Sequence, residues 1–164
     1  MLQPTLCCKR AYEITYEELA RYGIKALALD VDNTLTLHGS QELPDPIAEW
    51  LETMRSKGLE LFIISNNSRN RVAPFAGQLG LDYVYYAAKP LTIGLRRACR
   101  KFGLEKHEIM LVGDQIFTDL LAAHWFGCRS ALVEPMQQED GSLMRLKRVL
   151  ERPILKRIHE RAAD

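Results

Sequence analysis

The feature that most constrains the fold of this chain is an alternation of short apolar segments with stretches of helical periodicity. We expect five strands, over residues 24–31, 59–64, 82–87, 108–112 and 128–133. The first segment is apolar almost throughout, as a strand buried on both faces of a sheet should be. Alternation of strand and helix predicts a parallel sheet with right-handed crossovers. The expected fold class is α/β, a three-layer α/β/α sandwich with a mainly parallel five-stranded sheet.

Capping signals mark the helices between these strands. Thr15 and Glu18 form a capping box at the start of the first helix, and Gly23 ends it. Further helices are expected over residues 46–57, 69–79, 91–102 and 117–126. Pro74 should kink its helix or shift its start, and Pro153 should interrupt a C-terminal helical segment.

The length of the chain and its short connections predict a single domain. A chain of 164 residues is long enough to bury most of its apolar surface in one core. Each connection has room for one helix and little else, so we expect no cap domain or large lid. The predicted domain spans 1–164, with a core over about 14–133 and a basic amphipathic segment over about 142–161.

Composition and charge narrow the class of protein. Hydrophobic residues make up 47% and charged residues 26%, as in ordinary globular domains. With a net charge of +1, the chain as a whole has no strong electrostatic attraction for nucleic acid. The chain has no 18-residue apolar run and no signal-peptide pattern, and its four cysteines fit neither a zinc site nor a disulfide framework. We therefore expect a cytoplasmic protein with reduced thiols.

Two carboxylates, Asp30 and Asp32, stand one residue apart where the first apolar segment ends. Like charges this close repel each other unless a cation lies between them or one carries a proton. The pair therefore indicates a functional site. The alternative is a solvated turn, because Asp, Asn and Thr all favour turns.

Polar groups also follow the other predicted strands. Ser65 follows the second, Lys89 the third, and Gly113 and Asp114 the fourth, with Asp119 five residues beyond Asp114. In open parallel sheets, ligands bind at the carboxyl ends of the strands. These residues would then converge on one crevice.

Each of these residues has a structural explanation when it is taken alone. Lys89 resembles an ordinary surface lysine, and Ser65 a helix cap or loop residue. Asp119 suits the first turn of a helix, where the helix dipole stabilises acids. His38, in the loop after the acidic pair, is either a solvated histidine or a substrate contact.

The combined set suits phosphoryl chemistry. A carboxylate nucleophile approaches a phosphate monoester only if the negative charges of both are offset. Asp30 and Asp114 can hold Mg²⁺, which prefers carboxylates, water and phosphate oxygens. Lys89 adds a positive charge, while Ser65 and the backbone N–H of Asn66 can donate to the phosphoryl oxygens.

Together the four segments resemble the haloacid dehalogenase superfamily of phosphohydrolases. Residues 30–35 match its first motif, Ser65 its second, Lys89 its third, and residues 113–119 its fourth. The resemblance implies a Rossmann-like fold, and the absence of a cap insertion resembles its capless subclass III. Residues 14–133 look like the YqeG-type family, which includes phosphatidylglycerophosphate phosphatases.

The resemblance implies a role for each matched residue. Asp30 would form an aspartyl-phosphate, and Asp32 would serve as general acid and base while its carbonyl binds the metal with Asp30 and Asp114. Asp119 would orient Lys89 or a metal-bound water. The supporting residues would be Thr34 in the turn and at the substrate, Asn33 beside the pocket, and Gly113 in the fourth motif.

The expected function is Mg²⁺-dependent hydrolysis of a phosphomonoester, with phosphatidylglycerophosphate or another large, exposed phosphate as substrate. The alternatives are a non-enzymatic interaction protein and a phosphotransferase with an acceptor other than water. Residues 142–161 carry seven Lys or Arg against two Glu. This helix either docks its apolar face on the sheet or lies on an anionic bilayer, which would make the protein peripheral at the inner face of the membrane.

Overall fold

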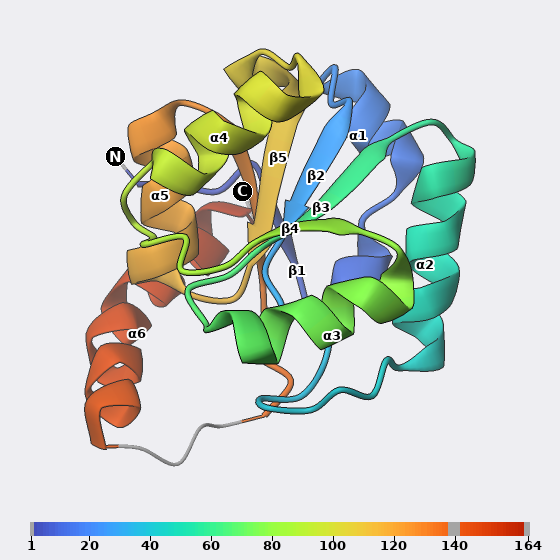
Figure 1. Cartoon of the computed structure of the whole chain (residues 1–164). Coiled ribbons are helices and arrows are strands. Elements are labelled where there is room, and N and C mark those ends of the chain that lie inside the picture. Colours follow the sequence, from blue (N-terminus) through green and yellow to red (C-terminus); the bar gives the residue numbers. More distant parts are fainter. Residues whose placement is uncertain (1, 138–141, 163–164) are drawn as a thin grey trace.

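The computed structural model describes residues 2–137 and 142–162 of the chain. The side chain of Arg161, counted above among the basic residues, lies outside the described part. All strand pairs in the sheet are parallel, and the strands lie in the order β1-β6-β5-β2-β3-β4 (Figure 1). Their bounds are β1 Leu6–Cys8, β2 Ala26–Leu29, β3 Glu60–Ile64, β4 Asp82–Val84, β5 Ile109–Gly113 and β6 Arg129–Val133.

Helices cover both faces of this sheet, which confirms the predicted three-layer α/β fold. Their bounds are α1 Tyr16–Arg21, α2 Asp45–Ser56, α3 Arg69–Leu79, α4 Ile93–Phe102, α5 Leu121–Phe126 and α6 Ser142–Ala162. A π-helical turn, η3 Ile116–Leu120, precedes α5, and two short 3₁₀ turns, η1 Ala11–Glu13 and η2 Lys106–Glu108, lie in connections. Among the described residues, no helix is both long enough and apolar enough to span a membrane.

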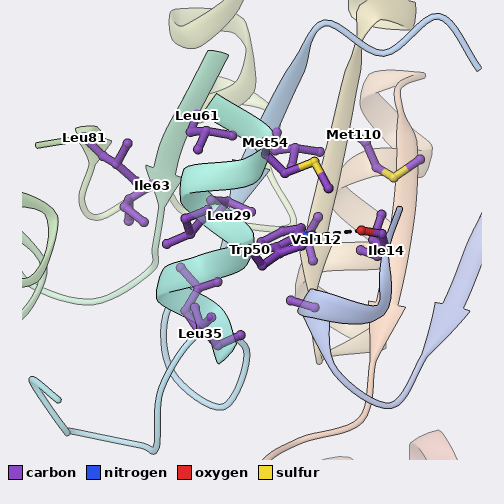
Figure 2. Packing of buried hydrophobic residues seen from close by; sticks show 14 of the residues in the cluster. Ile14, Leu29, Leu35, Trp50, Met54, Leu61, Ile63, Leu81, Met110 and Val112 are labelled. Atoms are coloured by element: carbon purple, nitrogen blue, oxygen red, sulfur yellow. Dashed lines mark hydrogen bonds between the residues drawn. The ribbon is translucent and has the colours of Figure 1, made fainter. Parts of the chain in front are cut away.

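The two faces of the sheet carry separate hydrophobic clusters because side chains alternate along each strand. On β2, Leu27 and Leu29 point to one cluster, while Ala26 and Ala28 belong to the other. Figure 2 shows the first cluster, in which α2 packs on the sheet. There the indole N–H of Trp50 donates to the carbonyl of Ile14 at 2.8 Å, so the buried ring has its one polar group satisfied.

The sheet has six strands rather than the predicted five. The additional strand, β1, pairs with β6 at one edge, with Leu6 opposite Ala131. A strand of three residues is too short to show a periodic pattern. The predicted strand over 82–87 is also shorter in the structure, because Tyr86 and Ala88 adopt positive φ values of 42° and 58° that turn the chain away from extended backbone.

The C-terminal helix continues through Pro153, which corrects the predicted interruption. A proline inside a helix removes one hydrogen bond and costs about 3 kcal/mol. Tertiary packing offsets this cost. Ile158 is buried beyond the proline, and Ile154 and Leu155 pack with it against a cluster on η3 and β6. Helix α3 likewise runs without a break across Pro74.

Candidate active site

Four charged side chains meet at the carboxyl edge of the sheet, and we call them the inner cluster: Asp30, Lys89, Asp114 and Asp119. All four are less than 8% exposed. The Lys89 ammonium donates to Asp30 Oδ1 at 2.8 Å and to Asp119 Oδ1 at 2.5 Å. The three carboxylates each have an oxygen within 4.8 Å of the others. Three strand ends thus bring the predicted charged residues into one small volume.

Local backbone contacts hold the inner cluster in place. Asp30 follows β2 directly, and its N–H donates to the Val112 carbonyl of β5 at 2.9 Å. The side-chain amide of Asn66 makes two hydrogen bonds to the backbone of Lys89. It accepts the Lys89 N–H at 2.7 Å and donates to the Lys89 carbonyl at 2.8 Å. The Asn66 side chain therefore positions Lys89.

Gly113 leaves space for the carboxylate of Asp119. A Cβ at position 113 would lie 2.3 Å from Asp119 Cγ, so any other residue would displace the carboxylate. The carboxylate is held there because its Oδ2 accepts the N–H of Gln115 at 3.1 Å. The π-helical turn that follows β5 thus places Asp119 beside Lys89 rather than at the surface.

Burial dominates the electrostatics of the inner cluster. It raises the pKa of Asp30 to about 7, although Lys89 acts in the opposite direction. Burial and the charges of Asp30 and Asp119 raise the pKa of Asp114 to about 8, despite the nearby Arg148. Burial alone would lower the pKa of Lys89, but the two carboxylates beside it outweigh that effect and raise it. Lys89 is therefore charged. The positive charge beside Asp30, Asp114 and Asp119 does not balance their negative charges.

A divalent cation would meet this deficit. Asp30 and Asp114 each have a carboxylate oxygen within 4.8 Å of the other, and oxygen ligands of this kind suit Mg²⁺. Both oxygens of Asp119 accept hydrogen bonds, from Lys89 and from Gln115, and Asp114 Oδ2 likewise accepts one from Arg148. The residues present therefore fit a magnesium ion held between β2 and β5.

Asp32 lies in a different setting, the outer cluster, which consists of Asp32, Arg71, Asn67 and Gly39. Arg71 of α3 donates to Asp32 Oδ1 from Nε at 3.2 Å and from Nη2 at 2.9 Å. The N–H of Gly39 reaches the same oxygen at 2.7 Å, and the Asn67 amide donates to Oδ2 at 2.8 Å. In each of these contacts the neighbouring residue donates the hydrogen bond to Asp32. Protein groups therefore already compensate the negative charge of Asp32.

Helix α6 closes one side of the site. Arg148 Nη2 contacts Asp114 Oδ2 at 2.5 Å, and its Nη1 donates to the Asp114 carbonyl at 3.1 Å. The buried Glu151 pairs with Arg148 at 3.1 Å and accepts the N–H of Ile116 at 2.9 Å. An ion pair and a capped turn therefore anchor the helix beside the inner cluster.

A pocket of about 190 Å³ opens between the two clusters. Its lining residues are Asp30, Asp32, His38, Ser65, Asn66, Asn67, Lys89, Gln115, Thr118 and Lys147. Pockets that bind drug-sized ligands have volumes of about 300–1,000 Å³. This smaller pocket therefore accommodates a small group such as phosphate and leaves the rest of a large substrate outside. A larger hollow of about 1060 Å³ lies beyond Asp114 and Arg148, lined mainly by β1, β6 and the segment after β6.

The other predicted residues lie beside the pocket or behind it. The Ser65 hydroxyl accepts the N–H of Asn67 at 3.1 Å. The buried Thr34 directs its hydroxyl at Asp114 Oδ1, 3.5 Å away, and is not among the lining residues. Asn33 adopts a φ of 61°, which suits the turn after β2 and which Asn tolerates better than most residues.

Sequence reasoning missed four residues that complete the site. Arg71 and Asn67 contact Asp32, Arg148 contacts Asp114, and Lys147 lines the pocket. Arg71 and Arg148 lie on helices far along the chain from their partners and carry no motif. Asn67 stands only two residues from Ser65, so its place in the predicted strand-end loop was the one available signal.

Comparison with known proteins shows the family of the chain. A model of the haloacid dehalogenase-like hydrolases matches residues 37–127, which include Ser65, Lys89, Asp114 and Asp119. The chain belongs to this family. The predicted family and the predicted enzyme class, a hydrolase, are thereby confirmed, whereas the roles of individual site residues stay predictions.

Two curated relatives and one solved structure are similar to the chain. The Bacillus subtilis (strain 168) protein named "Probable phosphatase YqeG" is 35% identical over 147 residues, 90% of this chain and 86% of its own length. An Arabidopsis thaliana protein named phosphatidylglycerophosphate phosphatase 1 is 26% identical over 94% of this chain and 47% of its own. A crystal structure of an uncharacterized Listeria monocytogenes protein covers 72% of this chain and 85% of its own, with a TM-score of 0.58 and 16% identity, which supports the fold alone.

Proposed function

We propose that the protein is a Mg²⁺-dependent phosphomonoester hydrolase that forms an aspartyl-phosphate on Asp30. The observation that carries this proposal is the position of Asp30 at the base of a phosphate-sized pocket, 2.8 Å from Lys89 and beside Asp114. A buried carboxylate of this kind is a nucleophile whose charge needs compensation before it can approach an anionic substrate.

The charges around the pocket suit a phosphate dianion. Asp30, Asp114 and the carbonyl of Asp32 would hold Mg²⁺, which polarises the phosphoryl group and screens the nucleophile. The Lys89 ammonium balances charge on the phosphoryl oxygens, and its fixed backbone keeps it in place. The hydroxyl of Ser65 and the N–H of Asn66 provide further donors in the lining of the pocket.

Two displacement steps follow from this arrangement. In the first, Asp30 attacks phosphorus, the bond from phosphorus to the leaving oxygen breaks, and that oxygen takes a proton from Asp32. In the second, water attacks phosphorus and gives a proton to Asp32, and the bond to Asp30 breaks to release inorganic phosphate. Positioned acid–base assistance of this kind is worth about 10²- to 10⁴-fold.

The outer cluster sets the conditions for the proton transfers. Arg71, Asn67 and Gly39 surround Asp32 with donors, which suits the carboxylate that receives a proton from water. For the first step Asp32 must carry that proton, so its contact with Arg71 must loosen when substrate enters. Arg71 is therefore a positioning residue for Asp32 in this proposal.

The size of the pocket favours a phosphate presented by a larger molecule. Only the phosphoryl end of a substrate fits within about 190 Å³. The name of the Arabidopsis relative supports a lipid phosphate, with phosphatidylglycerophosphate as the first candidate. A phosphorylated protein, nucleotide or sugar is the second class to test.

The proposal is tested by phosphate release from a panel of lipid, protein, nucleotide and sugar phosphates, with and without Mg²⁺. We expect Mg²⁺-dependent release that Asp30→Asn abolishes, and a phosphorylated peptide containing Asp30 after rapid quenching. Phosphate release that persists in Asp30→Asn would overturn the nucleophile assignment. Binding of phosphorylated ligands without release by the wild type would favour the interaction-protein alternative.

A further inference from the structure

We infer that the face around the pocket docks on an anionic lipid bilayer. The docking surface consists of the outward side of α6 and the loops that border the pocket. This inference deepens the proposed function, because the docked protein would meet its phosphomonoester at the membrane. The docking itself rests on the surface alone and needs no catalysis.

Helix α6 carries apolar residues on two opposite faces, and the inner face also holds the ion pair of Glu151 with Arg148. The inner face is docked, with Glu151 1% and Ile158 4% exposed. On the outer face, Leu146, Val149 and Leu150 are 55%, 53% and 54% exposed. Their spacing of three and four residues places them on one side of the helix. Figure 1 shows α6 as an outer arm of the molecule that ends near the sheet.

Basic side chains lie along one flank of this outer apolar stripe and within it. The exposed residues around it are Arg145, Arg152, Lys156 and Arg157. Among the described side chains of α6, the acidic groups are Glu151, which is buried, and Glu160, which lies 3.9 Å from Lys156. The outward side therefore combines basic and apolar residues, the pattern of helices that lie at the interface of anionic bilayers.

Further exposed apolar side chains lie in the segments that contribute His38 and Lys89 to the pocket. Leu37, Tyr86, Leu91 and Ile93 are 46%, 66%, 53% and 59% exposed. Leu37 follows the turn after β2. Tyr86 and Leu91 lie on either side of Lys89 in the segment between β4 and α4, and Ile93 is the first residue of α4. Of the ten large hydrophobic side chains exposed in the described residues, eight lie in these segments or on α6. Such clustering marks an interaction surface.

Charge and position favour a bilayer over other occupants. A second copy of the chain would bring two basic helices together, and their like charges would oppose association. An anionic bilayer offers negative headgroups to the basic residues and an acyl boundary to Leu146, Val149 and Leu150. Lys147 of the same helix lines the pocket, so docking would turn the pocket toward the headgroup layer.

Vesicle co-sedimentation of the full chain tests this inference. Wild-type protein is mixed with vesicles of phosphatidylglycerol and phosphatidylcholine, and separately with pure phosphatidylcholine vesicles. We expect binding to the anionic vesicles alone, weakened at high salt. Combined Leu146→Gln, Val149→Gln and Leu150→Gln should lower the bound fraction at least about tenfold while hydrolysis of soluble para-nitrophenyl phosphate stays at the wild-type rate.

Matched control variants distinguish binding through the docking surface from nonspecific binding of exposed apolar groups to vesicles. Tyr12→Gln with Trp125→Gln removes exposed apolar groups elsewhere and should leave vesicle binding unchanged. If the triple variant unfolds, combined Arg152→Gln, Lys156→Gln and Arg157→Gln provides the second measurement and should also release the protein from anionic vesicles.

Three outcomes overturn the docking inference. They are failure of wild type to sediment with anionic vesicles, unchanged binding by the folded variants, and a dimer in solution that the triple variant dissociates while vesicles bind nothing. The proposed function fails separately. A protein that binds anionic vesicles but hydrolyses no phosphomonoester contradicts the activity, whereas one that hydrolyses the soluble ester without binding vesicles contradicts only the docking.

Discussion

A single residue separates Asp30 from Asp32, yet the regions around them differ in charge. In the inner cluster, Asp30, Asp114 and Asp119 share one ammonium and one guanidinium. In the outer cluster, Asp32 alone receives two hydrogen bonds from Arg71 and one each from Asn67 and Gly39. The inner region therefore needs a further cation, while the outer region is already neutralised. In the proposed mechanism, the inner cluster accordingly binds metal and carries the nucleophile, and Asp32 of the outer cluster transfers the proton.

The largest expected effect comes from the inner carboxylate. Asp30→Asn keeps the shape of the side chain but removes the nucleophile, so activity should fall by about 10⁴-fold or more. The measurement is kcat with the best substrate of the panel at saturating Mg²⁺. A loss of less than about tenfold would place the attacking group elsewhere and break the assignment of roles.

Asp32→Asn should have a smaller effect. Because it removes acid–base assistance and leaves Asp30 intact, kcat should fall by about 10²- to 10⁴-fold. An activated ester, whose leaving group needs no proton, should partly restore the first step. Quenched-flow measurement of the phosphoenzyme tests this expectation. Equal losses for both ester types would contradict a role in protonating the leaving group.

A substitution at Arg71 sharpens the comparison further. Arg71→Gln keeps the fold of α3 but loosens Asp32, and a misplaced catalytic group should lower kcat by about tenfold. KM should change little, because Arg71 does not line the pocket. Arg100→Gln, on the exposed side of α4, serves as the control and should retain full activity. A rise in KM alone would instead indicate that Arg71 binds substrate.

The smallest expected effect is on stability in the absence of metal. Asp30 and Asp114 have pKa values raised to about 7 and about 8, so the folded protein holds protons that the unfolded chain has already lost. Stability that depends on a raised carboxyl pKa is greatest below about 4 and falls as pH rises toward about 8. The melting temperature of metal-free protein should therefore decrease by several degrees between pH 5 and pH 8.

Variants and metal identify the source of this pH dependence. Asp30→Asn should flatten the slope, since its amide does not titrate. Mg²⁺ should raise the melting temperature more at pH 8 than at pH 5, because metal competes with protons for the carboxylates. A metal-free melting temperature that is higher at pH 8 than at pH 5 in wild type, and unchanged by Asp30→Asn, would contradict the charge deficit of the inner cluster.

Much of the fold was predictable because local signals and packing agree. The capping box at Thr15 forms as expected, with the N–H of Glu18 donating to the threonine hydroxyl at 3.2 Å. The apolar strands pair in parallel. Two predictions failed. The strand β1 was missed because its three residues give only a weak local signal, and the break at Pro153 was wrong because the packing of the buried Ile158 stabilises α6 beyond the proline.

The sequence by itself determined the strand and helix alternation, the family, and the set of polar residues at the strand ends, because these depend on residues close together in the chain. Tertiary structure alone decided which charges face one another. Arg71 reaches Asp32 from 39 residues away, and Arg148 reaches Asp114 from 34. Such pairs form only after helices pack on the sheet, and the range of a charge in a folded protein is set by distance and burial rather than by position in the chain.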